Sequence, residues 1–391
     1  MIRIQIILVF VYTVLAGDIM FGQETADSWA SKYLSFSGYL KYMNTSSFRN
    51  LDVILSDNLI HNRLNFKAYI NKNVTFTTEM RNRMVWGNTL NLYPNYPELL
   101  DSNNDGIDLS FFPVKEKGFI MLLEIDRLNF DFSNEKWHVV IGRQRINWGK
   151  NLAWNPNDIF NTYNFFDFDY EERPGTDALR VQYYLSGNSS IETAINYKKN
   201  WDDNTLALKY NFHAGNYDFQ ILTAKYLRDF MMGLGWEGVI KNIGFKGELS
   251  YFSPKDKEFD NTFVGALSLD YYFKNGIAIN LGSLYNSTGI SQITNLDISE
   301  FSSVKVSPKR LMPNKWSFFA QASKAFTPAI NASFSAIYAK ELDAYFAMPQ
   351  FSYNIAQNWD VDITGQLFYG KENDKITNLA NSIFLRFRYS F

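Results

Sequence analysis

The chain has no cysteine among its 391 residues and only three histidines. Without cysteine there is no disulfide framework, no thiolate metal site and no thiol nucleophile. His61, His138 and His213 leave few groups for acid–base catalysis near neutral pH. The sequence also lacks a glycine-rich phosphate loop, a metal-spaced histidine cluster and a nucleophile elbow. These absences argue against an enzyme.

Long apolar runs and an excess of one charge are missing as well. After residue 16 no apolar run approaches the roughly 20 residues that a membrane-spanning helix needs. Lys and Arg total 38 and Asp and Glu total 40, so the formal net charge of −2 gives no reason to expect nucleic acid as a partner. No linker, low-complexity tract or change of composition marks a domain boundary, so we expect a single domain.

The first 22 residues have the pattern of an export signal. Met1 to Arg3 provide a positive start, and Ile4 to Ala16 form an apolar stretch of signal-peptide length. Cleavage after Ala16 and cleavage after Gly22 both fit, and without cysteine a lipoprotein is excluded. We therefore predict a cleaved signal peptide at 1–22, export from the cytoplasm, and one domain over 23–391.

Alternation of apolar and polar residues recurs along the chain, which predicts β-strands with one apolar and one polar face. Short polar turns alternate with connections of variable length, the longest at 87–118, 149–177 and 288–314. Aromatic residues make up 17% of the chain, enough to form the interfacial girdles of a membrane barrel. Clear examples of the alternation are 60–70, 179–185, 206–212 and 359–369.

The C-terminus shows the same alternation and ends on an aromatic residue. Ile383, Leu385 and Phe387 share one parity with the last aromatics, while Arg386 and Arg388 take the other. This ending resembles that of Gram-negative outer-membrane β-barrels, whose final strand carries a terminal Phe that the barrel-assembly machinery reads. The resemblance implies that the insertion signal comprises Phe387, Tyr389 and Phe391.

Together these patterns predict an all-β fold. We expect a transmembrane, antiparallel, up-and-down β-barrel of about 18 strands (16 to 18), with short periplasmic turns and long extracellular loops, located in the outer membrane. An array of soluble β-sandwiches is the alternative; it predicts linkers and a cysteine or repeat signature. The chain resembles the porin superfamily, including its phosphate-selective and alginate-export-like branches.

The segment 149–177 breaks the strand pattern, and in our parse it is the third extracellular loop. Its many aromatic residues would be badly exposed on a loop in water. It resembles the third loop of general porins, which folds into the lumen and narrows the channel. The acidic residues that we assign to this constriction are Asp158, Asp167, Asp169, Glu171 and Glu172.

Basic residues on the polar faces of several strands predict a wall opposite this loop. Guanidinium groups facing carboxylates across a narrow lumen would create a transverse field that favours dipolar solutes. The alternative is that these charges pair into a network that fills the lumen and conducts nothing. The predicted pore-lining basic residues are Arg63, Lys67, Arg81, Arg83, Arg143, Arg145, Arg180, Arg386 and Arg388.

Residues 101–108 begin like a calcium-binding loop. Asp101, Asn103 and Asp105 place oxygen ligands at alternate positions, and Gly106 allows a sharp turn. Phe112 stands where the bidentate Glu of such a loop is expected, and a polar extracellular turn explains the residues as well. We otherwise expect no cofactor.

These observations predict a porin-like channel for passive diffusion of small hydrophilic solutes, anionic or zwitterionic because of the basic wall. The alternative is a non-conducting β-barrel subunit of an outer-membrane assembly or surface complex. A barrel hydrolase would have to use His61 as its base. Besides lipid, the assembly machinery and the solute, the expected partners are a second copy of the chain or an outer-membrane complex.

Overall fold

A computed structural model describes residues 32–93, 95–101, 106–162, 165–166, 173, 175–185, 188–256, 258–290, 306–372 and 375–391. The predicted signal peptide at 1–22 lies outside these residues. Within the described part of the chain, no helix is long and apolar enough to cross a membrane.

Nearly all of the described chain is β-structure, with short helical turns in the connections. The helical turns are α3 (Asn88–Leu92), α4 (Tyr96–Leu100), η1 (Trp201–Asp203) and η2 (Lys340–Leu342). The strands are β1 (Leu34–Phe48), β2 (Leu55–Asn71), β3 (Val74–Gly87), β4 (Ser110–Glu116), β5 (Phe119–Ser133), β6 (Trp137–Gln144), β7 (Thr176–Tyr184), β8 (Ser190–Asn196), β9 (Thr205–Ala214), β10 (Tyr217–Tyr226), β11 (Asp229–Ile240), β12 (Ile243–Pro254), β13 (Thr262–Tyr272), β14 (Ile277–Asn286), β15 (Trp316–Ala325), β16 (Ile330–Ala339), β17 (Ala344–Ala356), β18 (Trp359–Glu372) and β19 (Lys375–Ser390).

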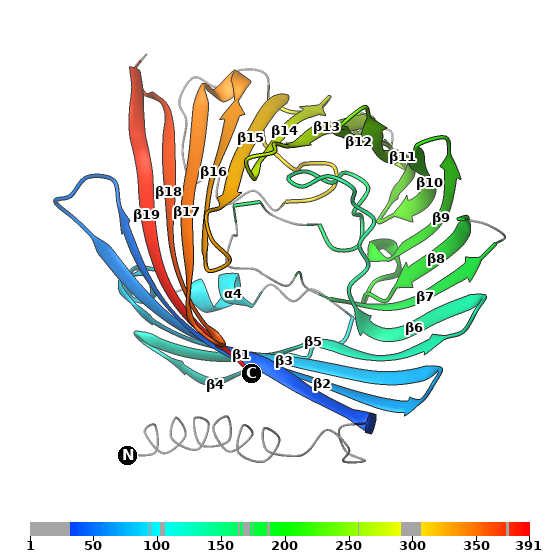
Figure 1. The fold of residues 1–391 in the computed structure, drawn as a ribbon, viewed down its shortest axis with the longest axis horizontal. Helices are drawn as coiled ribbons and strands as arrows, with labels where there is room; N and C mark the ends of the chain where they lie inside the picture. The colour runs from blue at the N-terminus through cyan, green and yellow to red at the C-terminus, as the bar shows by residue number, and fades with distance from the viewer. Residues whose placement is uncertain are drawn as a thin grey trace.

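The strands form one closed antiparallel ring (Figure 1). β1 pairs with β19, which closes the barrel, and Gly38 and Phe391 exchange backbone hydrogen bonds of 2.9 and 3.0 Å at the seam. β3 pairs with β5 directly, so the short β4, which pairs only with the first part of β5, is additional to the ring. The barrel has 18 strands, as predicted, and an array of β-sandwiches is excluded.

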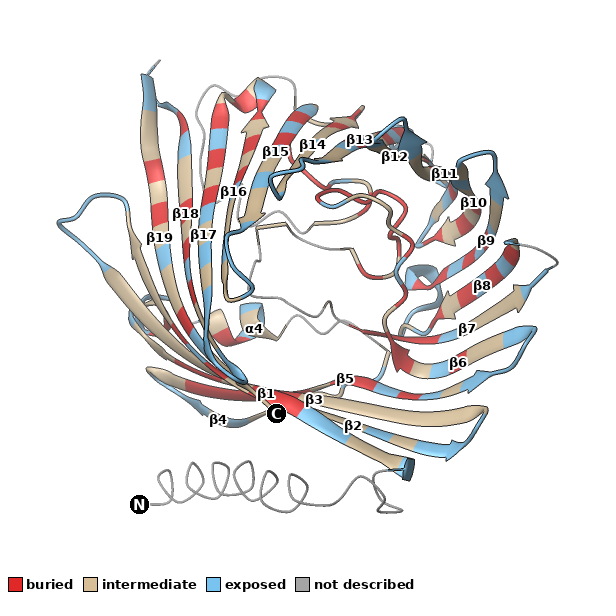
Figure 2. Cartoon of the chain, in the orientation of Figure 1, coloured by how far each residue is buried: buried red, intermediate tan, exposed pale blue. Residues whose placement is uncertain are grey.

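Side chains alternate between the inside and the outside of the barrel, as the period-2 pattern predicts. On β9, Thr205 and Ala207 are buried, whereas Leu206 and Leu208 are exposed. The same alternation gives the strands of the right-hand half their banded colouring in Figure 2. Apolar side chains therefore cover much of the outer face, as a barrel in contact with lipid requires.

The inner wall has two unlike halves. From β7 to β17 many of its residues are small or apolar, among them Ala194, Ala207 and Phe346, and these form the main buried cluster, although buried Glu192, Lys209 and Glu248 also lie on this half. On β1 to β6 it carries charged residues instead, among them Arg63 and Glu124. The long connection between β6 and β7 packs against the apolar half.

Candidate functional site: the lumen wall and the inward loop

The connection between β6 and β7 lies inside the ring of strands (Figure 1). Trp148, Trp154 and Ile159 are buried together with apolar residues of the inner wall. Trp154 packs edge-on against Phe319 of β15, with ring centroids 6.2 Å apart. Large aromatic side chains that would be exposed on a free loop are thus removed from water.

Glu248 of β12 fastens this loop to the wall. Its side chain is fully buried and points into the barrel, where its carboxylate accepts hydrogen bonds from the backbone N–H groups of Lys150 (2.5 Å), Asn151 (3.2 Å) and Asn157 (2.9 Å). One carboxylate thereby accepts hydrogen bonds from three backbone donors of the loop.

Asn157 makes the second attachment. Its amide donates to the Leu234 carbonyl at 3.0 Å and accepts from the Ser250 hydroxyl at 2.8 Å. Gly233 permits this approach, because a Cβ there would lie 2.6 Å from the Asn157 side-chain oxygen. Specific hydrogen bonds therefore attach the loop to β11 and β12.

Asp158 is the one predicted constriction carboxylate within the described residues; Asp167, Asp169, Glu171 and Glu172 lie outside them. It is buried, and it pairs with Arg173 at 3.2 Å and accepts from the Trp148 N–H at 3.4 Å. Burial raises the pKa of Asp158 to about 7, although the positive charges of Arg173 and Arg145 oppose the shift.

The predicted basic residues of β2 and β3 meet carboxylates of the wall itself. Arg63 and Arg81 stand directly opposite each other in the sheet. Arg63 binds Asp126 at 2.6 Å and Glu79 at 2.5 Å, and Arg81 lies 3.1 Å from Glu124 and 3.5 Å from Asp126. Carboxylates from β3 and β5 thus separate two guanidinium groups that would otherwise repel each other.

Arg83 and Arg143 extend the charged wall toward the long loops. Arg83 binds Glu124 at 2.6 Å and donates to the Leu100 carbonyl of α4 at 2.8 Å, so it also holds a helical turn against the wall. Arg143 binds both oxygens of Asp177 at 2.9 Å. That bidentate pair joins β6 to β7 where the inward loop begins and ends.

The C-terminal arginines lie on the same inner surface. Arg388 stands opposite Lys41 of β1, which in turn stands opposite His61 of β2. The Arg388 guanidinium lies over the Tyr39 ring at 5.5 Å, and Arg386 binds Asp362 at 2.9 Å.

The other three predicted basic residues are more scattered. Arg180 of β7 lies 3.9 Å from Glu192 and donates to the His138 ring at 3.1 Å. Lys67 is exposed near the far end of β2. Arg145 follows the end of β6 rather than belonging to a strand, because the chain turns inward there to begin the loop.

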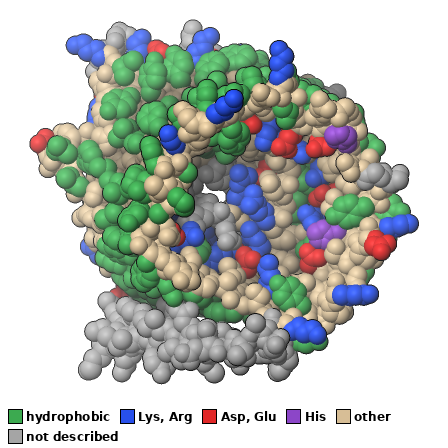
Figure 3. Space-filling model, viewed as in Figure 1, with side chains coloured by type: hydrophobic (Ala, Val, Ile, Leu, Met, Phe, Trp, Pro, Cys, Tyr) green, Lys and Arg blue, Asp and Glu red, His purple; other side chains and the backbone are tan. Residues whose placement is uncertain are grey.

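Basic and acidic side chains therefore alternate along one inner surface (Figure 3). The alternation in the sequence predicts the basic members of this surface but not most of their partners, Glu79, Glu124 and Asp126 among them. Glu79 was visible on the polar face of its strand. Asp126 was hidden because a bulge between β3 and β5 places Ile125 and Arg127 opposite consecutive residues and shifts the alternation.

The remaining predicted sites are the calcium-binding loop and His61. Asp101 accepts hydrogen bonds from the Ser110 hydroxyl, but Asn103 and Asp105 lie outside the described residues, so the calcium site stays a prediction. His61 is buried with its ring edge-on to Tyr39 at 5.3 Å.

Comparison with known proteins supports the fold. No protein-family model and no curated protein matches the chain. OccAB4 of Acinetobacter baumannii matches 94% of this chain over 99% of its own, at 10% identity and a TM-score of 0.58. Pseudomonas aeruginosa OpdQ and OccK8 (OprE) each match 92% of this chain over 98% of their own, at 9% identity and TM-scores of 0.57 and 0.56. The chain has a porin-type barrel fold.

At such low identity the likeness concerns the backbone only. What the chain shares with these structures is the barrel of antiparallel strands, while the lumen residues are those of this chain. The chemistry of the lumen has to be argued from those residues themselves.

Proposed function

We propose that this protein is an outer-membrane channel through which small hydrophilic solutes diffuse passively. The main observation is the division of the inner wall. The inward loop packs on the apolar half and leaves the charged half of β1 to β6 facing the hollow of the barrel (Figure 3). A hydrated, charged path inside an apolar exterior is what a polar solute needs to cross a membrane. The structural neighbours are outer-membrane porins, which supports the same proposal.

We further propose a preference for anionic or zwitterionic solutes. In the pairs Arg83–Glu124 and Arg180–Glu192 the guanidinium is the more exposed partner, at 13% against 7% and 19% against 4%. Three other pairs show the reverse order, because Arg63, Arg143 and Arg386 are less exposed than their partners Glu79, Asp177 and Asp362. Where a cation lies above a buried carboxylate, as at Arg83, the wall attracts negative groups and still avoids the cost of unpaired buried charge.

Single-channel recording in planar bilayers tests both proposals. We expect discrete conductance steps and, in a salt gradient, a reversal potential that shows preference for the anion. R81A/R83A should move that potential toward cation preference, whereas K340A, at an exposed position of η2, should leave it unchanged. Cation preference in the unmodified protein that R81A/R83A does not alter would reject the anionic assignment.

A specific observation favours a second candidate, a non-conducting barrel subunit of an outer-membrane complex. Buried hydrogen bonds hold the inward loop against the wall, and many of the described wall charges are paired with one another, as in a barrel whose interior is filled. Electrical silence of correctly folded protein, together with stable co-purification of other membrane proteins, would support the subunit over the channel.

We also propose that 1–22 is removed on export and that the terminal aromatic residues address the barrel to the assembly machinery. Phe387 is exposed on the outer face, and Tyr389 packs against Trp359, so the aromatic face of β19 is oriented away from the lumen. The mass of the mature N-terminal peptide from an outer-membrane fraction tests cleavage and location together. Calcium binding, self-association and the lack of enzymatic activity remain predictions.

A further inference from the structure

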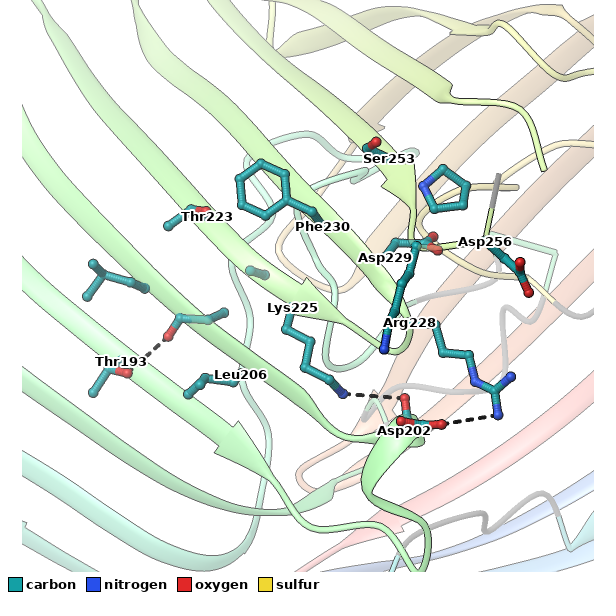
Figure 4. A pocket seen from close by; sticks show the side chains of 15 residues that line it. Thr193, Asp202, Leu206, Thr223, Lys225, Arg228, Asp229, Phe230, Ser253 and Asp256 are labelled. Atoms are coloured by element: carbon teal, nitrogen blue, oxygen red, sulfur yellow. Dashed lines mark hydrogen bonds and ion pairs between the residues drawn. The ribbon is translucent and has the colours of Figure 1, made fainter. Parts of the chain in front are cut away.

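A groove lies on the outer face of the barrel, at the edge where the long connections leave the strands. It encloses about 1070 Å³ and is lined by residues of β8 to β12 (Figure 4). This volume is at the upper end of the roughly 300–1,000 Å³ that is usual for small-molecule sites. Its walls include Leu206, Leu208 and Phe230.

The groove faces the surroundings of the barrel and not the lumen. Leu206, Leu208 and Phe230 are 45%, 48% and 52% exposed, whereas their neighbours Ala207 and Met231 are buried in the inner cluster. Since alternate residues of a strand point to opposite faces, the groove and the pore lie on opposite sides of the same wall. A ligand in the groove would therefore approach from the bilayer.

Small side chains in the middle of this surface create the depression. Leu208 stands between Thr193 of β8 and Thr223 of β10 in the sheet register. Outward positions on these strands otherwise carry larger residues such as Ile191 and Ile221. Two threonines thus flank Leu208 at positions where large apolar side chains would fill the space, and this leaves a depression in the outer face.

Charged residues surround the groove at its loop end. The aliphatic stem of Lys225 lies along the outer face, while its ammonium donates to the carbonyls of Trp201 (3.1 Å) and Asn204 (3.0 Å) in the β8–β9 connection. Arg228, in the turn after β10, lies 3.3 Å from Asp202. Lys255 follows the end of β12.

The charge at this rim is unbalanced. Asp229 also lines the groove, but Lys309 neutralises it at 2.7 Å. Lys225, Arg228 and Lys255 are then left facing Asp202 and Asp256. The groove therefore combines an apolar floor on the outer face of the barrel with three cations against two carboxylates at its loop end.

We propose that this groove binds a lipid that carries an anionic phosphate headgroup, with an acyl chain on the Leu206–Leu208–Phe230 floor and the phosphate at the rim. This inference rests on the proposed membrane location, but it does not depend on whether the barrel conducts. Lys255 and Arg228, the latter also paired with Asp202, are the exposed cations that would face the phosphate, and Lys225 adds positive charge from a fixed position.

Native mass spectrometry in a neutral detergent tests the proposal. Phosphatidylglycerol is titrated into the full barrel, with phosphatidylcholine as the net-neutral lipid and inorganic phosphate as the headgroup without a chain. We expect saturable binding of phosphatidylglycerol, weaker by roughly tenfold or more in R228A/K255A, since each basic residue near a lipid surface contributes about a fivefold change. T223W, which fills the floor with a residue suited to the outer face, should abolish binding.

The matched control is K115A/K340A, which removes two exposed cations from the same edge of the barrel away from the groove. It should bind phosphatidylglycerol as the unmodified protein does. Equal binding by all variants, or equal binding of both lipids, overturns the proposal. If inorganic phosphate alone competes for the site, the acyl chain does not contribute to binding. If a second copy of the chain or another polypeptide is cross-linked at position 223, the occupant of the groove is a protein and not a lipid. A barrel that conducts yet binds no phosphatidylglycerol loses this inference and keeps its channel function.

Discussion

The Glu248 carboxylate accepts a hydrogen bond from the Asn157 backbone N–H at 2.9 Å and so joins β12 to a loop 91 positions earlier in the chain. Both residues are completely buried. The bond links the wall of the barrel to the segment that fills part of its interior, so the width of any path through the lumen depends on it.

E248A should release the loop from the wall. The buried Asn157 N–H and the part-buried Lys150 N–H lose their acceptor, whereas the Asn151 N–H keeps the side-chain oxygen of Asn155. A buried unsatisfied group costs about 1–3 kcal/mol, so the docked position becomes unfavourable. We expect a larger and noisier single-channel conductance than in the unmodified protein, with proteolysis appearing within 150–157. Unchanged conductance in E248A would show that the loop does not limit the path. The control is E135A, at an exposed residue of the β5–β6 turn.

The docking of the loop should also depend on pH through Asp158. Its pKa lies at about 7 in the docked loop against 3.8 ordinarily, because burial disfavours the charged form. The docked state therefore binds more protons between these two values. The contribution of Asp158 to the stability of the docked state is fully present below pH 3.8. It falls between the two pKa values by up to roughly 1.4 kcal/mol per pH unit and is lost as the pH rises through 7.

Conductance recorded between pH 5 and pH 8 should consequently show more frequent wide-open events at the higher pH. D158N removes the titration of Asp158 and should weaken this dependence, whereas D256N, at an exposed carboxylate outside the lumen, should not. A D158N barrel that keeps the full pH response would assign the response to another group.

The barrel could be predicted from the sequence because its signal is local and repeated. Each strand carries its own alternation, and the two faces of a strand are fixed by a period of two residues. The seam of β1 with β19 followed from the same logic, since a closed barrel has to pair its first and last strands. The loop-to-wall contacts of Glu248 could not be predicted, because no periodicity connects positions 248 and 157.

Arg63 and Lys67 share one face of β2 but should differ greatly in their contribution to stability. Arg63 is buried between Glu79 and Asp126, whereas Lys67 is exposed. Removing one partner of a buried ion pair typically costs about 3–5 kcal/mol, and an exposed charge contributes about 0–1 kcal/mol. Urea unfolding of the detergent-refolded barrel should therefore show a large loss for R63A and almost none for K67A. Similar losses in both variants would contradict the burial argument.

Only part of the charged wall could be predicted from the alternation of residues along each strand. Parity predicted that Arg63, Arg81 and Arg83 share a surface, and their strand register agrees. It did not predict that Asp126 joins them, because the bulge in β5 is a property of the pairing with β3 and leaves no mark in the alternation of β5 alone.

Gly38 and Phe391 provide a test of barrel closure that separates backbone from side chain. A Cβ at Gly38 would lie 2.2 Å from the Arg63 carbonyl oxygen and 2.8 Å from the Phe391 ring. G38A must therefore displace the backbone of β2, and overpacking of this kind costs about 1–3 kcal/mol. G282A is the matched control, because a Cβ there would lie 3.4 Å from its nearest neighbour.

F391A tests the side chain, because it keeps the backbone pairing but loses the aromatic ring. We expect G38A to lower the yield of heat-modifiable, folded barrel both in cells and on refolding in detergent. F391A should lower it in cells only, because on our proposal the assembly machinery requires the terminal ring and the closed sheet does not. Equal defects of F391A in both settings would assign the ring a structural role at the seam instead of a role in insertion.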